Sequence, residues 1–464
     1  MAASRNKPRH SLIEVASRVL AAHVRHGDRI VLVVSGGLAS FVLAPVPPRL
    51  ADTLGLRVSA LHVHHGLHPD ADDWAAFCET WCASLRLPCR IVHVQVPRDA
   101  ADGPEAAARR ARFQAYRQCD ADWIVLGHHA DDQAETILHR LLRGAGPSGL
   151  SGMPTSRPLA ADTRTRLLRP LLEVQRARLL EYARAHGLAW VEDPSNRDTY
   201  YLRNFLRHEV LPLLESRLPG TRAALLRAGR LARSAESLLD RQADEDLAHI
   251  SRGGSWSASA LLSLPSERAV CLLRKLLREQ GAPLPSQARV LDIYRQLSGE
   301  DAGRGVRVAI GELRLCRYRD RFWIDHARSE HATMDNPDTF VVWHRESALP
   351  RVLPWRRGSL ELRESLGTGI SRARIASHGL RLESRRGGET LQVRAHGPHR
   401  SLKNLFQEAG IPAWLRDDTP LIWSGVNLVA LPNIAIAHTF AARADEPSLE
   451  LIWRYGAHVP GVRQ

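Results

Sequence analysis

The stretch Ile30-Val-Leu-Val-Val-Ser-Gly-Gly-Leu-Ala-Ser-Phe-Val-Leu43 changes abruptly from one type of secondary structure to another. Its first five residues are an apolar run rich in β-branched side chains, which predicts a buried strand, and its last residues predict an apolar helix. The two glycines between them let the backbone approach a phosphate closely, and the first free N–H groups of the helix point toward it. The stretch is therefore a candidate phosphate-binding loop.

The residues of the loop decide which kind of phosphate-binding loop it is. A Walker A loop needs a Lys-Ser/Thr pair after its last Gly, and a dinucleotide-binding loop needs a third Gly at fixed spacing. Neither is present. The segment Ser35-Gly-Gly-Leu-Ala-Ser40 instead resembles the PP-loop, Ser-Gly-Gly-x-Asp-Ser, of ATP pyrophosphatases, which split ATP into AMP and pyrophosphate.

Two features in and after the loop depart from this pattern. Ala39 stands where the PP-loop has Asp, and a methyl group neither ligates Mg²⁺ nor accepts a hydrogen bond. Pro45, Pro47 and Pro48 follow closely, and we expect them to interrupt the helix because interior prolines remove hydrogen-bond donors.

The charge balance indicates a polyanionic partner. The 464 residues include 64 Lys and Arg against 50 Asp and Glu, a formal net charge of +14. Neutralisation of phosphates drives such a chain toward nucleic acid, although basicity alone does not distinguish RNA from DNA or a membrane surface. The length predicts two or three domains.

Cysteine usage and hydropathy favour a cytoplasmic protein. The six cysteines contain no Cys-x-x-Cys pair, which suits a reduced compartment, and we expect them to be buried thiols. No run of 18 uncharged apolar residues occurs, and the first ten residues lack the apolar core of a signal peptide. A cytoplasmic location without a membrane partner is therefore expected.

Strands alternate with helices beyond the loop. Apolar runs at 57–66, 89–96 and 124–127 predict further strands, and apolar residues at spacings of three and four predict a helix over 70–82. Parallel strands joined by helices need helices on both faces of the sheet. The predicted fold class is α/β, a doubly wound parallel sheet of the PP-loop, Rossmann-like type.

A carboxylate-rich segment follows the strand at 124–127. In His128-His-Ala-Asp-Asp-Gln-Ala-Glu-Thr136, the spacing of Asp131, Asp132 and Glu135 places carboxylates on the first turns of a helix, beyond the carboxyl end of a strand. Open α/β sheets bind ligands at that edge. Acidic residues also favour helix N-termini for electrostatic reasons alone, so the spacing fits both capping and function.

A second helix, predicted from Gly103 to Phe113, carries charged residues on one face. Glu105, Arg109 and Arg112 are spaced four and three residues apart, so their side chains share that face. A solvated ion-pair face and a functional arginine pair both fit this pattern.

Five segments together resemble, in order and spacing, the bacterial tRNA(Ile)-lysidine synthases, and they cover most of residues 28–215. These segments are His62-Val-His-His-Gly-Leu67, His128-His-Ala-Asp-Asp-Gln-Ala-Glu-Thr136, Arg143-Gly-Ala-Gly146, Trp190-Val-Glu-Asp-Pro-Ser-Asn196 and Tyr201-Leu-Arg-Asn-Phe-Leu-Arg207. Segments near 385–389, 399–412 and 428–432 are similar to the small C-terminal tRNA-binding domain of the longer family members.

The resemblance and the composition divide the chain into four parts. We expect a PP-loop ATP-binding catalytic domain at 1–217, a helical tRNA-binding domain at 218–330, a linker at 331–358 and a small α+β tRNA-binding domain at 359–464. The middle part is predicted helical because it is rich in Leu, Ala and Arg with helical periodicity.

The family reaction converts the wobble cytidine of tRNA(Ile) with a CAU anticodon to lysidine. Adenylation activates O2 of the base, and the amine of free L-lysine then attacks C2, so that AMP and pyrophosphate are released. The resemblance implies ATP and Mg²⁺ as cofactors, tRNA(Ile) and lysine as partners, and a homodimer as a candidate assembly.

The resemblance also implies site residues. Phosphate and nucleotide contacts fall on Ser35, Gly36, Gly37, Leu38, Ala39, Ser40, His64 and His128; catalytic roles fall on Asp131, Asp132, Glu135, Arg109, Arg112 and Arg203, with Asp132 as the metal ligand; tRNA contacts fall on Arg385, Arg386, Arg400 and Lys403. The histidines lack metal-ligand spacing, so a nucleotide-pocket or packing role is favoured over a metal site.

Ala39 leaves alternatives open. Loss of one electrostatic contact costs on the order of 10²–10³ in rate, so the chain is either an active enzyme that uses other carboxylates, an impaired variant or a tRNA-binding pseudoenzyme. A PP-loop tRNA thiolase is a further alternative, disfavoured because thiolases with an iron–sulfur cluster need paired cysteines.

Overall fold

The computed structural model describes residues 11–97, 103–160, 163–282, 285–299, 303–326, 339–343, 351–375 and 377–455. The chain divides into two compact units, Met1–Leu238 and Leu239–Gln464. Each unit is described by itself below.

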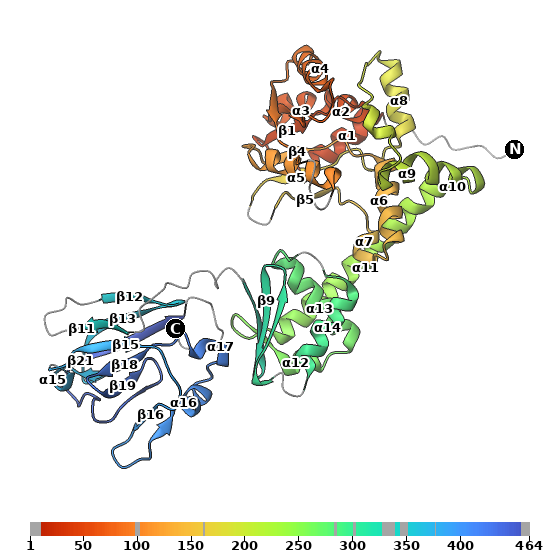
Figure 1. Ribbon diagram of the computed structural model, residues 1–464. Helices are drawn as coiled ribbons and strands as arrows, with labels where there is room; N and C mark the ends of the chain where they lie inside the picture. Colours follow the sequence, from red (N-terminus) through yellow and green to blue (C-terminus); the bar gives the residue numbers. More distant parts are fainter. Residues whose placement is uncertain are drawn as a thin grey trace. The chain divides into compact units, whose positions relative to one another are not determined.

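The first unit is built on a six-stranded sheet in the order β3-β2-β1-β4-β6-β5 (Figure 1). Its strands are β1 (Arg29–Val33), β2 (Arg57–His64), β3 (Cys89–His93), β4 (Trp123–Val125), β5 (Ser156–Pro158) and β6 (Arg166–Leu168). All neighbours pair in parallel except β5, which pairs antiparallel with β6 at the edge. The register aligns Leu32, Val125 and Leu168, so β1, β4 and β6 end at one common edge.

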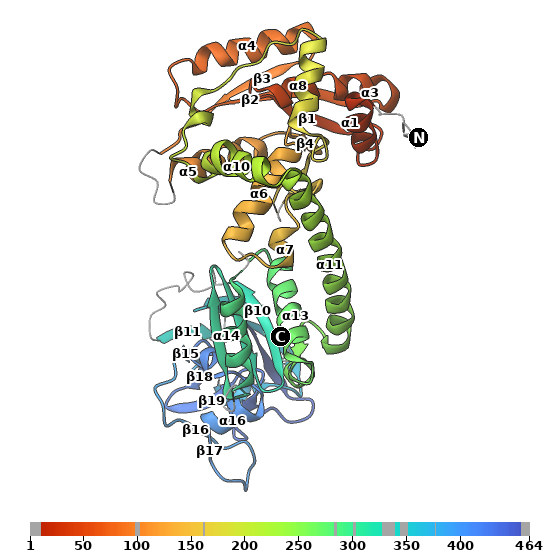
Figure 2. The same ribbon diagram turned by 90° about the vertical axis from the view of Figure 1, so that its right-hand side faces the viewer.

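Helices connect these strands and cover both faces of the sheet (Figures 1 and 2). The helices and helical turns that begin in this unit are α1 (Leu12–Ala21), α2 (Leu38–Leu43), α3 (Val46–Leu54), α4 (Ala71–Ser84), α5 (Pro104–Arg117), α6 (Ala130–Leu142), α7 (Pro147–Leu150), α8 (Arg176–Ala185), the 3-10 turn η1 (Pro194–Arg197), α9 (Leu202–Phe205), the π-helical turn η2 (Leu206–Val210), α10 (Leu211–Arg217) and α11 (Thr221–Ile250). Helix α11 continues into the second unit.

Alternating residues of β1 enter two different cores. Ile30 and Leu32 pack in a cluster with residues of α1, α2, α4 and α8, whereas Val31 packs in a cluster with Ala115 and Tyr116 of α5. A strand buried on both faces is the expected signature of a doubly wound parallel sheet. The predicted fold class is confirmed.

The prolines after the loop act as expected. Helix α2 ends at Leu43, and α3 begins at Val46 with Pro45 as its N-cap. Pro47 and Pro48 fall in the first turn of α3, where a missing N–H costs no intrahelical hydrogen bond.

The middle of the chain contains more than helices. It has α12 (Ala258–Leu262), α13 (Ser266–Glu279) and α14 (Gln287–Ser298), and also a sheet in the order β7-β10-β9-β8. The strands are β7 (Trp256–Ser257), β8 (Val306–Ile310), β9 (Leu313–Tyr318) and β10 (Arg321–His326). The predicted helices of the region 218–330 are present, and the structure adds this sheet to them, because alternation such as Val306-Arg-Val-Ala-Ile310 buries every second residue of a strand.

The C-terminal region is α+β, as predicted, but begins earlier. Two sheets run in the orders β11-β15-β18-β19-β20 and β12-β13-β21-β14, beside the hairpin β16-β17. Its elements are β11 (Thr339–Trp343), β12 (Arg351–Trp355), β13 (Gly358–Leu366), β14 (Ile370–Ser371), α15 (Arg372–Ile375), β15 (Leu380–Glu383), β16 (Thr390–Leu391), β17 (Arg400–Ser401), α16 (Leu402–Glu408), α17 (Ala413–Arg416), β18 (Leu421–Ser424), β19 (Asn427–Leu431), β20 (Ala435–Ile436) and β21 (Pro447–Tyr455).

The predicted linker at 331–358 is corrected by two of these strands. Both β11 and β12 lie inside it and pair with β15 and β13 of the C-terminal sheets. Residues 331–338 and 344–350 of the predicted linker lie outside the described residues. Within the described part of the chain, no helix has the length and apolar content needed to cross a bilayer.

Candidate active site at the carboxyl edge of the parallel sheet

The loop after β1 has the tight backbone that its glycines predict. Gly36 has φ +81°, a left-handed conformation, and a Cβ atom there would lie 3.3 Å from Cβ of Val191. Its carbonyl accepts a hydrogen bond from the N–H of Val191 at 2.9 Å. Only glycine fits this position without strain, so the loop is held against the segment Trp190–Asn196.

The loop residues differ in what they offer a ligand. Ser35 is exposed, whereas Ser40 is buried and its hydroxyl donates to the carbonyl of Gly37 at 2.8 Å. The side chain of Leu38 is 7% exposed and belongs to the core, so its predicted nucleotide contact is limited to its backbone. Ala39 packs against the same core.

Gly127 brings the next strand end against this loop. A Cβ atom at Gly127 would lie 3.1 Å from both the carbonyl carbon of Ala39 and the amide nitrogen of Ser40. The missing side chain lets the backbone after β4 pack directly on the start of α2. The acidic segment that follows Gly127 is thereby placed beside the loop, as the sheet-edge argument predicts.

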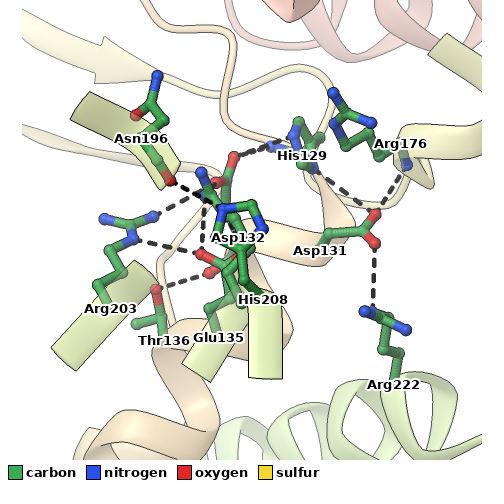
Figure 3. Close-up of polar contacts among 11 residues, drawn as sticks. His129, Asp131, Asp132, Glu135, Thr136, Arg176, Asn196, Arg203, His208 and Arg222 are labelled. Atoms are coloured by element: carbon green, nitrogen blue, oxygen red, sulfur yellow. Dashed lines mark hydrogen bonds and ion pairs between the residues drawn. The ribbon is translucent and has the colours of Figure 1, made fainter. Parts of the chain in front are cut away.

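Helix α6 presents the predicted carboxylates near its N-terminus. Asp132 accepts a hydrogen bond from the N–H of His129 at 3.0 Å, which caps the first turn. Glu135 lies one turn further on, and its side chain is 2% exposed. Asp131 points elsewhere: it accepts the N–H of Arg176 at 2.7 Å and lies 3.4 Å from Nε of Arg222 (Figure 3).

Two arginines, one from α9 and one from η2, donate hydrogen bonds to the carboxylates of Asp132 and Glu135. Arg203 contacts them from Nη2 and Nε at 3.3 Å each (Figure 3). Arg207 is closer, at 2.6 Å from its Nε to Oε1 of Glu135 and 2.8 Å from Nη2 to both Oε2 of Glu135 and Oδ1 of Asp132. We call these four residues the carboxylate–arginine network.

The charges around Asp132 and Arg207 keep these two side chains ionised. Burial would raise the pKa of Asp132, but His129, Arg203 and Arg207 oppose it and lower that pKa to about 2. Burial would lower the pKa of Arg207, but its hydrogen bonds to Glu135 raise it overall. Asp132 and Arg207 are therefore both charged throughout the physiological pH range.

Arg207 was not among the predicted site residues. The signal was present in Tyr201-Leu-Arg-Asn-Phe-Leu-Arg207, where Arg203 and Arg207 are four residues apart and share one helical face.

Hydrogen bonds join the turn that carries these two arginines to η1 and the residue after it. Nδ2 of Asn204 donates to the carbonyls of Ser195 and Asp198 at 2.9 Å, and Nε2 of His208 lies 2.8 Å from the carbonyl of Asn196.

The predicted histidines occupy two different surroundings. The ring of His64 packs against that of His93 at a tilt of 41°, with the centroids 4.4 Å apart, and its Nε2 lies 3.0 Å from Asp72. His128 lies beside the network: burial, together with Arg169, Arg203 and Arg112, lowers its pKa to about 3. His128 is therefore a neutral ring at neutral pH, suited to a nucleotide contact rather than to charge.

The arginines of α5 face the same edge. The charge of Arg112 acts on both His65 and His128, so this exposed side chain lies within electrostatic reach of the network. The guanidinium of Arg109 lies 5.6 Å from the ring centroid of Phe113. The position of Arg112 near the histidines of this edge is consistent with the functional arginine pair, one of the two interpretations of this helix face.

The carboxylates of the network do not form a preformed magnesium site. Among the described residues, no group of three or more His, Cys, Asp or Glu side chains is arranged to hold a metal. The oxygens of Asp132 and Glu135 already accept from Arg203, Arg207 and the N–H of His129. The predicted role of Asp132 as a metal ligand gains no support from this arrangement.

Sequence comparisons identify the family. The PP-loop domain family matches residues 10–214, the TilS substrate binding domain matches 257–323, and the TilS substrate C-terminal domain matches 380–453. The tRNA(Ile)-lysidine synthase of Nitrosomonas europaea is 38% identical over 434 residues, which cover 94% of this chain and 93% of that protein. The chain belongs to the tRNA(Ile)-lysidine synthase family. A second member, from Alkalilimnicola ehrlichii, is 41% identical over 416 residues, covering 88% of this chain and 90% of that protein.

The TilS C-terminal match contains the predicted tRNA-contacting patch, Arg385, Arg386, Arg400 and Lys403. Each arginine in it has a carboxylate partner: Arg385 lies 3.5 Å from Asp417, Arg386 lies 3.8 Å from Glu383, and Arg400 pairs with Glu408. Lys403, on α16, is exposed and forms no ion pair within the described residues.

Proposed function

We propose that this protein is a tRNA(Ile)-lysidine synthase, which joins free L-lysine to C2 of the wobble cytidine of tRNA(Ile) with a CAU anticodon. In the first step, O2 of cytidine bonds to the α-phosphorus of ATP and pyrophosphate leaves. In the second step, the lysine amine bonds to C2, the C2–O2 bond breaks and AMP leaves. The single observation that carries the proposal is the carboxylate–arginine network beside the PP-loop, in a chain that matches this family over nearly its whole length.

The loop Ser35–Ser40 is the proposed phosphate site. Its exposed Ser35 and the backbone around Gly37 face the edge of the sheet where the acidic helix begins. Arg112, exposed on α5, supplies positive charge at the same edge. These groups would hold the ATP phosphates and stabilise charge that builds up on the leaving groups.

The network is the proposed binding site for the lysine ammonium group. An ammonium group fits between Asp132 and Glu135 only if an arginine moves away, because the carboxylate oxygens are already occupied. Arg203 is the arginine that would move, since its contacts are 3.3 Å long whereas those of Arg207 are 2.6–2.8 Å. A displaced Arg203 would then be available to a phosphate or to the lysine carboxylate.

Single-turnover incorporation of labelled lysine into purified tRNA(Ile) with a CAU anticodon, in the presence of ATP and Mg²⁺, tests the function. We expect incorporation by the wild-type chain and a rate about 10²–10³ higher in Ala39→Asp, because the new carboxylate restores a contact at the reacting phosphates. No incorporation by either protein, with the tRNA still bound, would support the pseudoenzyme instead.

The movement of Arg203 has its own test. We expect Arg203→Gln to change the Michaelis constant for lysine, whereas Arg207→Gln should mainly destabilise the fold, because Arg207 makes the shorter bonds. Equal effects of the two variants on the Michaelis constant for lysine and on stability would contradict the proposed displacement of Arg203 by lysine.

A thiolase activity finds no support in the arrangement of cysteines. Cys78, Cys82 and Cys316 are buried, and the remaining three are half-buried. The expectation of buried thiols is confirmed for the first three.

A further inference from the structure

A second group of arginines lies at the same sheet edge, beyond the network. Arg169 directly follows β6, Arg157 lies in β5, Arg140 lies in α6 and Arg109 lies in α5. The guanidinium groups of Arg109 and Arg157 share one aromatic ring, lying 5.6 and 5.3 Å from the centroid of Phe113. We call these four residues the β6-edge cluster.

Three members of the cluster, Arg140, Arg157 and Arg169, donate hydrogen bonds to backbone carbonyls. Arg169 donates to the carbonyl of Pro154 at 2.9 Å, Arg157 to that of Pro158 at 3.2 Å, and Arg140 to those of Gly149 and Gly152 at 2.9 Å. Within the described residues, none of Arg140, Arg157 and Arg169 forms an ion pair with a carboxylate. The negative charge of Glu236 acts on Arg140, where it opposes the lowering of the pKa by burial and by Arg109.

Arg169 is the most unusual member. It is 4% exposed, and its buried Nε has no hydrogen-bond partner within the described part of the chain. Burial, Arg157 and Arg109 lower its pKa to about 10, so it remains charged at neutral pH. A buried guanidinium with an unused donor among other guanidinium groups is costly unless an anion completes the site.

The position of the cluster distinguishes it from the ATP phosphates. Strand β4 lies between β1 and β6, and neighbouring strands are about 4.8 Å apart, so Arg169 lies roughly 10 Å across the sheet edge from the PP-loop. His128, at the end of β4, feels the charges of both Arg169 and Arg203, which places the cluster next to the network. An anion here would lie beside the reacting base rather than on the ATP phosphates.

We propose that the β6-edge cluster is a subsite for a backbone phosphate of the RNA substrate, adjoining the nucleotide that enters the network. The proposal rests on the proposed function. Several guanidinium groups suit a phosphate better than a carboxylate, because they provide many donors in fixed planes around a tetrahedral anion. Phosphate contacts of this kind set the register of the RNA and carry no base information.

The test measures binding of an RNA stem-loop with a CAU anticodon to the full chain at several salt concentrations. We expect Arg157→Gln to weaken binding about 5–10-fold at low salt and to reduce the slope of log K against log salt by about 0.7, as for one lost phosphate contact. Inorganic pyrophosphate should bind to this variant with unchanged affinity. Arg169→Gln should act in the same direction if thermal unfolding shows that it folds; if it does not fold, Arg157→Gln alone decides.

Arg166→Gln is the matched control. Arg166 is also a half-buried arginine stacked on an aromatic ring, 5.7 Å from the centroid of Trp123, and it bonds Ser156 rather than a carboxylate. Its replacement should leave both RNA and pyrophosphate binding unchanged.

Three results would overturn the proposal. An unchanged salt slope in folded Arg157→Gln would exclude the subsite while leaving the proposed function intact, provided that the wild-type chain binds the stem-loop. A loss of pyrophosphate affinity with unchanged RNA affinity would assign the cluster to the leaving group instead. Failure of the wild-type chain to bind the stem-loop at low salt would overturn the proposed function and the subsite together.

Discussion

The arginines of the sheet edge and those of the C-terminal patch are arranged in opposite ways. At the sheet edge, Arg203 and Arg207 share two buried carboxylates, whereas Arg140, Arg157 and Arg169 donate to carbonyl groups and form no ion pair with a carboxylate of the described residues. In the patch, every predicted arginine is paired locally, and the side chain of Arg386 is 77% exposed.

The difference shows that a count of arginines is a poor guide to phosphate binding. An exposed pair such as Arg386 with Glu383 contributes little and is screened by salt, so a ligand displaces it easily but gains little from it. A buried charge is costly to leave unmatched, so its position marks where an oppositely charged ligand is most useful. The comparison leads to four measurements, given from the largest expected effect to the smallest.

Glu135→Gln should have the largest effect. It removes the charge that opposes Arg203 and Arg207, so we expect lysine incorporation to fall about 10²–10³-fold and the free energy of unfolding to fall by about 3 kcal/mol. Single-turnover assays and denaturant titration measure the two quantities. The control is Glu192→Gln, which removes an exposed partner 2.8 Å from Arg197 and should cost less than about 0.5 kcal/mol. Equal losses of unfolding free energy in Glu135→Gln and Glu192→Gln would contradict the contrast between buried and exposed ion pairs.

Arg207→Lys should have the next largest effect. Lysine keeps the positive charge but cannot reproduce the forked contacts that Arg207 makes with Asp132 and Glu135. We expect a loss of about 1–2 kcal/mol in unfolding free energy, in the range of charge-assisted hydrogen bonds. Arg400→Lys in the patch is the matched change and should leave stability unchanged; a similar loss there would contradict the comparison.

The pH dependence of stability should reveal the buried environment of His128. Burial lowers its pKa to about 3, so between pH 6.5 and 3 the unfolded chain binds a proton that the native chain does not. Stability therefore falls as the pH falls through this range, by about 2 kcal/mol at pH 5 from this group. Denaturant titrations at pH 7 and pH 5 should show a smaller difference in His128→Asn than in the wild type. The control is His186→Asn, which replaces an exposed ring stacked on Tyr182 and should keep the pH dependence of the wild type. Identical pH dependence of stability in His128→Asn and the wild type would contradict the buried environment of His128.

Changes in the C-terminal patch should have the smallest effects. Lys403→Gln should weaken RNA binding about 3-fold and lower the salt slope by about 0.7, because this exposed lysine has no competing ion pair in the described residues. Arg400→Gln should change binding less, since Arg400 is already paired with Glu408. Fluorescence anisotropy with full-length tRNA measures both, and a larger effect of Arg400→Gln would reverse the proposed ranking.

Much of the fold followed from local patterns. The strand at 30–34, the glycine turn and the helix rich in Asp and Glu after 128 are short-range features, and each lies where its pattern indicated. The strands β8 and β9 were missed although they alternate, because the Leu-rich and Arg-rich composition around them favoured helix. The strands β11 and β12 were missed because short edge segments carry little local signal.

The site was predicted in part. Asp132, Glu135 and Arg203 meet in the structure, whereas the roles that the resemblance assigned to them stay predictions. The sequence did not show that Arg207 closes the network or that Arg169 is buried.

By itself, the sequence determined the class of the sheet, the place of the phosphate loop and the types of residue at its edge, because strand periodicity, glycine turns and helix caps depend on neighbours in the chain. Only the tertiary structure decided which charges oppose one another. Arg207 and Glu135 are 72 residues apart and Arg203 and Asp132 are 71 residues apart. Charges so distant in sequence meet only when the sheet brings the ends of β1, β4 and β6 to one edge and the turn at α9 and η2 packs against α6.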